Sequence, residues 1–238
     1  MRLVLLGAPG AGKGTQSKKI LEKYNIPYIS TGDYFRKEVA SGSEIGLEIQ
    51  RYIDRGLLVP DYITIDIVEK ILEEESFQKN YLFDGFPRTV IQARMMDFIT
   101  KYTKNPVELV INLDIKEGLL IDRLTGREIC KNCNAIYHKL NKPSKVEGIC
   151  DVCGSKLSQR ADDTLENVMI RLREYRNRTQ PLIKYYKEKG ILVNIDSSQD
   201  SEVVFQEICK VLEDLKWSQS RMIKKLNWCV LLVESVLQ

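Results

Sequence analysis

A glycine-rich stretch near the amino terminus constrains this chain more than any other feature. Gly7-Ala-Pro-Gly-Ala-Gly-Lys13 directly follows the apolar run Arg2–Leu6 and opens a predicted helix over 13–24. It matches G-x-x-x-x-G-K, in which backbone N–H groups converge on phosphate oxygens and the lysine reaches the terminal phosphates. The usual Ser or Thr after the lysine is displaced, because Gly14 comes first and Thr15 follows. The alternative interpretation is an ordinary glycine-rich turn, which the flanking strand and helix disfavour.

Strand and helix alternate along most of the chain. Short apolar runs predict further buried strands at Tyr81–Asp84, Val107–Asp114 and Leu192–Asp196, and a helix is expected over about 202–216. This order predicts an α/β fold, a P-loop-type parallel sheet with helices on both faces. Two stretches break the rhythm: about 30–59 resembles short helices without a strand, and about 126–163 lacks helical periodicity. Both are expected to be insertions at the carboxyl edge of the sheet, where α/β proteins bind ligands.

Composition narrows the class of protein. The chain has 238 residues and 43% hydrophobic content, which suffices for one sizeable core. Its net charge of +3 is too small to indicate nucleic-acid binding from charge alone. A loop interrupts Leu3–Leu6 before it could serve as a secretion signal, and no apolar run approaches the roughly 20 residues of a membrane-spanning helix. We therefore expect a soluble, cytoplasmic protein with no nucleic-acid or membrane partner.

Four of the six cysteines form two Cys-x-x-Cys pairs. Cys130 and Cys133 are separated by 16 residues from Cys150 and Cys153. In a cytosolic chain this spacing favours a closed tetrahedral metal site, with Zn²⁺ or another thiophilic ion in a structural role, over two redox pairs. Because four thiolates complete such a shell, His138 is expected to pack or to hydrogen-bond. Cys209 and Cys229 stand apart and are expected to be small, partly buried apolar side chains.

Arginine and aspartate residues supply the remaining candidates. Arginine stays charged and offers a planar fork of donors that suits polyphosphates, and the candidates are Arg36, Arg88, Arg123, Arg127, Arg160 and Arg171. Arg123 and Arg127 would share one side if their helix continues. Asp84 ends a strand and could orient Mg²⁺ through its waters, or could simply form a turn before Gly85. His138 is the only histidine, and no histidine or cysteine suits nucleophilic catalysis. Transfer between two phosphates needs no general base, because the acceptor oxygen is already ionised, so positioning and charge would suffice.

Together these residues resemble the adenylate kinases in the long form with a zinc-bearing lid, from Met1 to about Lys216. Gly7–Thr15 is similar to the family's G-x-P-G-x-G-K-G-T, and Asp84-Gly-Phe-Pro-Arg88 with Gln92 is similar to the core of its AMP site. The resemblance implies reversible phosphoryl transfer from Mg-ATP to AMP, giving two ADP, by a monomer. It divides the chain into a core (1–29, 60–125 and 164–216), an AMP-binding domain (30–59), a lid (126–163) and a C-terminal extension (217–238).

The same resemblance implies which residues act. Those on the ATP side would be Gly10, Ala11, Gly12, Lys13, Gly14, Thr15, Arg123, Arg127, Ile136, Tyr137 and Gln199. Those on the AMP side would be Thr31, Arg36, Leu57, Leu58, Val59, Gly85, Phe86, Pro87, Arg88, Gln92, Arg160 and Arg171. Catalysis would rest on Lys13, Asp84, Arg88, Arg123, Arg127, Arg160 and Arg171, with Gln92 reading the adenine edge. Glu128 departs from the family, which commonly has a second arginine there.

Two rival hypotheses stay open at this point. The nearer rival is another nucleoside-monophosphate kinase. Thr31, Gln92 and the long 126–163 segment argue against UMP/CMP kinases, in which a different acceptor site and a short lid are expected. A P-loop protein with a nucleic-acid-binding Cys₄ ribbon would need more aromatic residues than the one in that segment, Tyr137. The tail 217–238 matches nothing in the family, and its stretch 228–237 is mostly apolar and Val-rich. It could be a membrane-surface or partner-binding helix, an extra helix on the core, or an addition without a selected role. We expect it to pack on the core or on a neighbouring molecule.

Overall fold

The centre of the molecule is a parallel sheet, seen in a computed structural model that describes residues 1–215 and 217. Its five strands lie in the order β2-β3-β1-β4-β8. They are β1 (Arg2–Gly7), β2 (Tyr28–Ser30), β3 (Tyr81–Asp84), β4 (Leu109–Asp114) and β8 (Leu192–Asp196). Neighbouring strands are parallel throughout, with Val4 opposite Phe83 on one side and Val110 on the other. The predicted fold class is confirmed.

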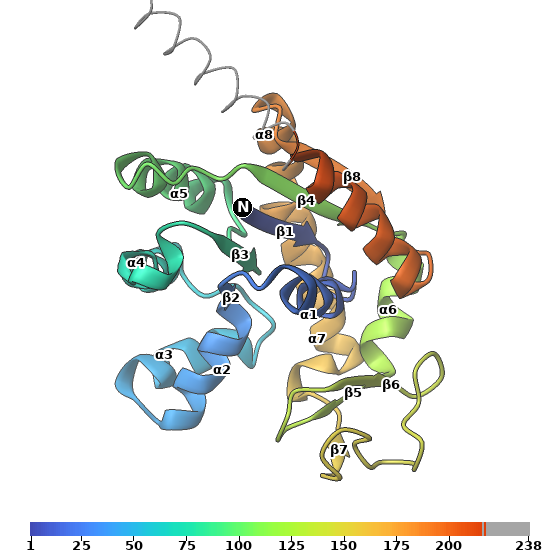
Figure 1. Ribbon diagram of the computed structural model, residues 1–238. Helices are drawn as coiled ribbons and strands as arrows, with labels where there is room; N and C mark the ends of the chain where they lie inside the picture. The colour runs from blue at the N-terminus through green and yellow to red at the C-terminus, as the bar shows by residue number, and fades with distance from the viewer. Residues whose placement is uncertain (216, 218–238) are drawn as a thin grey trace, which may run out of the picture.

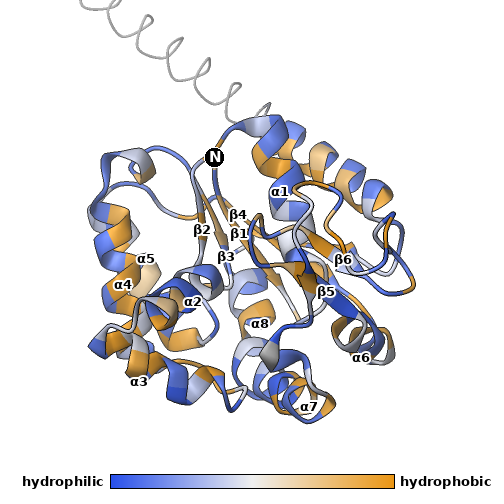
Figure 2. Cartoon of the chain, turned by 90° about the horizontal axis from the view of Figure 1, so that it is seen from below, coloured by the Kyte–Doolittle hydropathy of each residue, from blue (hydrophilic) through white to orange (hydrophobic). Residues whose placement is uncertain are grey.

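Helices cover both faces of this sheet because its strands are apolar on both sides. They are α1 (Lys13–Tyr24), α4 (Asp61–Glu73), α5 (Val90–Tyr102), α6 (Glu117–Thr125), α7 (Leu165–Glu174), α8 (Pro181–Glu188) and a helix over 201–215. Leu3 and Leu5 face one core, with α1, α6, α7 and the 201–215 helix. Val4 and Leu6 face the other, with α4, α5 and α8. In Figure 2 the apolar strands lie in the middle of the molecule, between helices that carry both apolar and polar residues.

Two insertions project from the same end of the molecule, one on each side of it (Figure 1). One holds α2 (Thr31–Ser41) and α3 (Glu44–Ile53), which pack with α4 around a small core that includes Phe35 and Ile49. The other is an antiparallel sheet in the order β6-β5-β7, made of β5 (Arg127–Cys130), β6 (Ile136–His138) and β7 (Leu157–Ser158). We call this second insertion the lid. Three short helical turns complete the described chain: η1 (Glu75–Phe77), η2 (Ala161–Asp163) and the π-helical η3 (Tyr175–Thr179).

The structure departs from the expected elements in two places. Strand β2 was not predicted. It has only three residues and ends where α2 begins, so its apolar pattern is too short to recognise in the sequence. Helix α6 ends at Thr125, so Arg123 lies on a helix and Arg127 on a strand rather than both on one helix. No helix among residues 1–215 and 217 is long and apolar enough to cross a membrane. Cys209 is buried as expected; Cys229 and the rest of the tail lie outside the described residues.

Candidate active site

The glycine-rich loop turns sharply between β1 and α1. Gly7 has φ of 145°, and a Cβ there would lie 2.8 Å from the carbonyl oxygen of Leu113, so only glycine fits against β4. The Lys13 ammonium donates to the carbonyl oxygens of Gly7 at 2.8 Å and Ala8 at 3.1 Å. Burial lowers the pKa of Lys13 from its ordinary 10.5 to about 8. The loop therefore holds a buried cation beside the amino terminus of a helix, which is a site built for anionic oxygens.

Asp84 lies next to this loop because β3 pairs with β1. Its side chain is buried, at 9% exposure, and Tyr28 donates to its Oδ2 atom over 3.2 Å. Among residues 1–215 and 217, no lysine or arginine nitrogen lies within 4.0 Å of this carboxylate. A buried carboxylate without a paired cation is costly, so this one fits a hydrated Mg²⁺ beside the phosphates.

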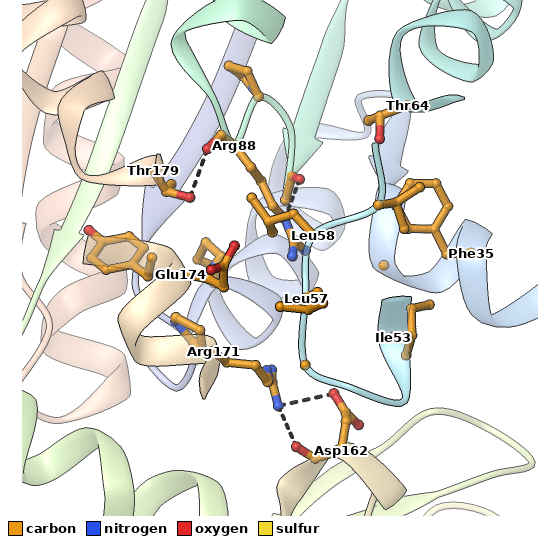
Figure 3. Close-up of a pocket in the computed structure, with 18 of the residues that line it drawn as sticks. Phe35, Ile53, Leu57, Leu58, Thr64, Arg88, Asp162, Arg171, Glu174 and Thr179 are labelled. Atoms are coloured by element: carbon orange, nitrogen blue, oxygen red, sulfur yellow. Dashed lines mark hydrogen bonds and ion pairs between the residues drawn. The ribbon is translucent and has the colours of Figure 1, made fainter. Parts of the chain in front are cut away.

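A cavity opens between the loop, α2, the segment 56–59 and α7. Predicted residues on its wall are Lys13, Arg36, Leu57, Leu58, Val59, Gly85, Pro87, Arg88, Gln92 and Arg171. Figure 3 shows Leu57 and Leu58 on one side of it, with Arg171 and Glu174 of α7 opposite. Its wall combines apolar side chains with several cations, which is the composition expected for a nucleotide base and its phosphates.

Arg36, Arg88 and Arg171 lie on the wall of this cavity, whereas the predicted Arg160 is not on the wall and lies within electrostatic range of Arg36 and Arg127. Arg88 donates from Nε to the carbonyl oxygen of Gly85 at 2.7 Å, and burial together with nearby Arg171 lowers its pKa to about 10. Burial and the charge of Arg127 lower the pKa of Arg160 to about 10 as well, and the Arg160 Nε atom is buried without a hydrogen-bond partner among the described residues. Both arginines stay charged at neutral pH because their pKa values remain near 10. A bound polyanion would offset the repulsion between these cations.

Asp163 joins the lid to α7. Its side chain is fully buried and accepts two hydrogen bonds from Arg127, Nε to Oδ2 at 2.7 Å and Nη2 to Oδ1 at 2.6 Å. Arg171 of α7 donates to the same carboxylate at 2.9 Å and to the carbonyl oxygen of Asp162 at 3.0 Å. One buried carboxylate thus orients two of the predicted catalytic arginines. A bidentate pair of this kind fixes the orientation of the Arg127 guanidinium.

The other predicted ATP-side residues come from α6, from the lid and from the segment after β8. Arg123 donates to the carbonyl oxygen of Ser197 at 3.0 Å, and burial lowers its pKa. Ile136 approaches Gly14, since a Cβ on Gly14 would be 3.7 Å from its Cδ1 atom. Tyr137 points away into the lid, where its hydroxyl accepts from the backbone N–H of Asp151 at 2.8 Å. Gln199 donates to Glu207 at 3.5 Å.

On the AMP side, Gln92 is held at both ends of its amide. It is 2% exposed, its Oε1 accepts from the backbone N–H of Arg88 at 2.7 Å, and its Nε2 donates to Asp61 at 2.8 Å. Thr31 donates to the carbonyl oxygen of Gly85 at 2.8 Å. Phe86 is not on the cavity wall and packs in the core under the sheet.

Sequence patterns missed part of the cavity wall. Phe35, Ile53, Thr64, Asp162, Glu174, Tyr175 and Thr179 line it without having been singled out. Thr179 donates to the carbonyl oxygen of Arg88 at 2.9 Å from the π-helical turn η3. Such turns inside α-helices are frequent at functional sites, but nothing in the residue types of Tyr175–Thr179 announces one.

The four cysteines of the lid meet at one point. Their Sγ atoms all lie within 4.8 Å of one another, with Cys130 3.4 Å from Cys153 and Cys133 3.5 Å from Cys150. Tetrahedral Zn²⁺ with Zn–S bonds of about 2.3 Å separates its sulfurs by about 3.8 Å, so the cluster fits that ion. His138 is excluded from the shell, since its ring hydrogen-bonds the Asp122 carbonyl oxygen and the Leu140 N–H. Four thiolates leave no open position, which supports a structural role.

Comparisons with known proteins agree with this geometry. A family model described as adenylate kinase matches residues 5–191. The adenylate kinase of Caldanaerobacter subterraneus subsp. tengcongensis is 49% identical over 212 residues, covering 89% of this chain and 96% of the relative. That of Methanosarcina acetivorans is 46% identical over 212 residues, covering 89% and 98%. That of Geobacillus sp. is 48% identical over 216 residues, covering 91% and 100%.

Proposed function

We propose that the residues of the cavity and the glycine-rich loop carry out the reaction of the adenylate kinase family, to which this chain belongs. That reaction transfers the terminal phosphoryl group of ATP to AMP and gives two ADP. One observation supports this assignment of residues above the others. Lys13, Arg88 and Arg171 are brought together at a single cavity although they come from three distant parts of the chain.

ATP would bind along the glycine-rich loop. Backbone N–H groups from Gly10 to Thr15 would hold its phosphates, and Lys13 would leave its two carbonyl partners to reach them. Mg²⁺, bound with ATP, would neutralise developing charge, and Asp84 would hold its waters. Arg123 and Arg127 would add positive charge from the lid side, and Ile136 would cover the base near Gly14.

AMP would bind in the cavity between α2 and α7. Arg36 and Arg88 would hold its phosphate, and Leu57 to Val59 would pack against its base. An amide has two N–H donors and two carbonyl lone pairs, so Gln92, with one of each engaged, retains one of each for the adenine edge. Thr31 would contribute beside Gly85.

The chemical step needs charge and alignment rather than a base. An oxygen of the AMP phosphate attacks the terminal phosphorus of ATP, and the bond from that phosphorus to the ADP leaving oxygen breaks. Arg88, Arg160 and Arg171 would balance the charge on the transferring group, and Arg127 would do so from the lid. The attacking oxygen carries no proton at neutral pH, so the step requires no proton acceptor.

The division of labour among parts of the chain is also part of this proposal. Segments 1–29, 60–125 and 164–216 form the core, 30–59 binds AMP, and 126–163 closes over ATP to exclude water. Zn²⁺ on the four cysteines would hold the lid's fold and take no part in the reaction. We further propose that the enzyme acts as a cytoplasmic monomer.

A coupled assay of ADP formation with AMP, CMP, UMP and GMP as acceptors tests the proposal. AMP should support turnover far better than the others, and Gln92→Leu should reduce that preference, since it removes the remaining amide donor and acceptor. Equal turnover with another monophosphate would contradict the assigned AMP site. ATP hydrolysis that depends on nucleic acid and not on AMP would contradict the function itself.

A further inference from the structure

The carboxylate of Asp84 has only two side-chain neighbours that can donate to it in the described structure. Ser17 lies 3.5 Å from Oδ2, and Tyr28 lies 3.2 Å from the same atom. Ser17 has a single hydroxyl proton, and its carbonyl acceptor on Lys13 is closer, at 2.9 Å. The shorter bond takes that proton, so Ser17 contributes little to Asp84. Tyr28 remains as the side chain whose hydroxyl proton is directed to this carboxylate, over 3.2 Å.

Strand register explains how Tyr28 reaches Asp84. On β2 and β3, Tyr28 lies opposite Leu82 and Ser30 lies opposite Asp84. Side chains alternate along a strand, so Tyr28 and Asp84 share one face of the sheet, two residues apart along it. The tyrosine ring packs against the core on that face, beside α1, and carries its hydroxyl forward to the carboxylate. The ring is therefore anchored and the hydroxyl has a fixed position.

We propose that Tyr28 is a positioning residue for the metal: its hydroxyl fixes the orientation of the Asp84 carboxylate, which would hold the waters of Mg²⁺. The proposal rests on the proposed role of Asp84. Without the hydroxyl, Asp84 can rotate toward the cations that line the loop, and the metal loses an oriented acceptor. Partners that orient a directly ligating group typically change metal affinity by roughly 10–100-fold, and a partner of Asp84, which would hold the metal through water, should give the lower end of that range.

The variant Tyr28→Phe removes the hydroxyl and keeps the ring. The control Tyr24→Phe removes a hydroxyl from a tyrosine of the same core whose neighbours are Cys209 and Lys23 rather than Asp84. Mn²⁺ serves as a paramagnetic probe, and its dissociation constant is measured by water-proton relaxation on enzyme saturated with an inhibitor that joins two adenosines through a phosphate chain. The affinity of the inhibitor, measured without added divalent metal, shows separately whether each variant still binds the nucleotide groups normally.

Tyr28→Phe should weaken Mn²⁺ about 10-fold, at the lower end of the range for such partners, while Tyr24→Phe leaves it unchanged. Metal-free inhibitor affinity should be the same in all three proteins. Asp84→Asn should also weaken Mn²⁺, and Tyr28→Phe should add nothing in that background, because it acts through the lost carboxylate.

Each other outcome counts against the inference. Normal Mn²⁺ affinity in Tyr28→Phe, with weakened affinity in Asp84→Asn, would overturn the role of Tyr28 and leave that of Asp84 standing. Additive losses would show that Tyr28 acts independently of Asp84. Unchanged affinity in Asp84→Asn would overturn the metal role of Asp84 and the inference with it. A Tyr28→Phe protein that no longer melts cooperatively would show that the hydroxyl serves the fold instead.

Discussion

Buried cations set the electrostatics of this protein. Lys13, Arg88 and Arg160 each have a pKa that burial lowers, which means that the folded chain holds their charged forms at a cost. Asp84, Asp162 and Asp163 offset part of this charge but leave an excess of cations around the cavity. A polyphosphate supplies the missing negative charge, so the same arrangement that weakens the empty fold strengthens binding.

Lys13 gives this argument a measurable pH dependence. The pKa of Lys13 is about 8 in the folded chain, against an ordinary value of 10.5. Between pH 8 and pH 10.5 the unfolded chain therefore binds more protons than the folded chain, and the free energy of unfolding increases as the pH rises. Phosphate oxygens around the ammonium raise its pKa again. Binding of the two-adenosine inhibitor at pH 8 should therefore take up about half a proton.

Calorimetry in buffers of different ionisation enthalpy measures that uptake. The matched variant Lys13→Met has a side chain of similar length and no charge. It should bind the inhibitor more weakly, and its binding should take up no proton at this position. Equal proton uptake by both proteins would show that the proton belongs to another group.

Arg88 tests whether a forked donor is needed at the transferring phosphate. Arg88→Ala should lower kcat by roughly 10²–10³, the usual cost of one positioned donor, with little change in melting temperature. Arg88→Lys keeps the charge but loses the planar fork, so it should recover only part of the rate. Steady-state kinetics at saturating AMP separates the three proteins, and a near-normal kcat in Arg88→Ala would remove Arg88 from the chemistry.

Individual residues were predictable from sequence where spacing alone defines a site. The loop from Gly7 to Lys13 and the two Cys-x-x-Cys pairs have local geometries that any fold must respect. Tyr28, Asp163 and Thr179 carry no such pattern, because their roles arise from partners 56, 36 and 91 residues away in the chain. Long-range hydrogen bonds of this kind appear only once the fold has brought the partners together.

The lid is the part of the structure least able to fold by apolar packing. Its core consists of Cys130, Tyr137 and Cys150, with Cys133, Ala135 and Leu157 around them. So small a cluster buries too little surface to order about 38 residues, given a conformational cost of roughly 1–2 kcal/mol per residue. Binding of Zn²⁺ to four thiolates can supply the difference, as in other small metal-stabilised folds.

Removal of one zinc ligand should therefore affect stability before chemistry. Cys130→Ser should lower zinc content and reduce the melting temperature by several degrees, since about 1 kcal/mol corresponds to roughly 2–4 °C at this chain length. Activity should remain measurable in the cold. The control Cys209→Ser, in the helix over 201–215, should retain its zinc. Lost activity with an unchanged melting curve would point to a catalytic metal instead.

Strands and helices were predictable where the apolar pattern was long enough. Helix α1 and strands β3 and β8 lie where they were expected. The short β2 was missed because its pairing with β3 defines it, and two of its three residues are only half-buried. The end of α6 was uncertain because Gly126 is followed by residues equally suited to a helix or to β5.

The C-terminal extension tests where the catalytic unit ends. The last helix that the structure describes runs over 201–215, and the matches to the relatives cover about nine-tenths of the chain. Truncation after Lys216 should leave kcat for ADP formation largely unchanged and alter only solubility or stability. A truncated enzyme that stays folded and loses AMP-dependent turnover would assign the tail to the active machinery.

The proposed function requires both substrates to lie in one cleft that the two insertions close. The two-adenosine inhibitor spans both nucleotide sites, so it should bind tightly and protect 30–59 and 126–163 from proteolysis together, whereas ATP alone should protect less of 30–59. The decisive measurement is limited proteolysis with and without this inhibitor, with cleavage sites mapped by mass spectrometry. Joint protection of both insertions is the predicted result. Protection confined to the residues around Gly7 to Lys13 would contradict the single two-substrate cleft.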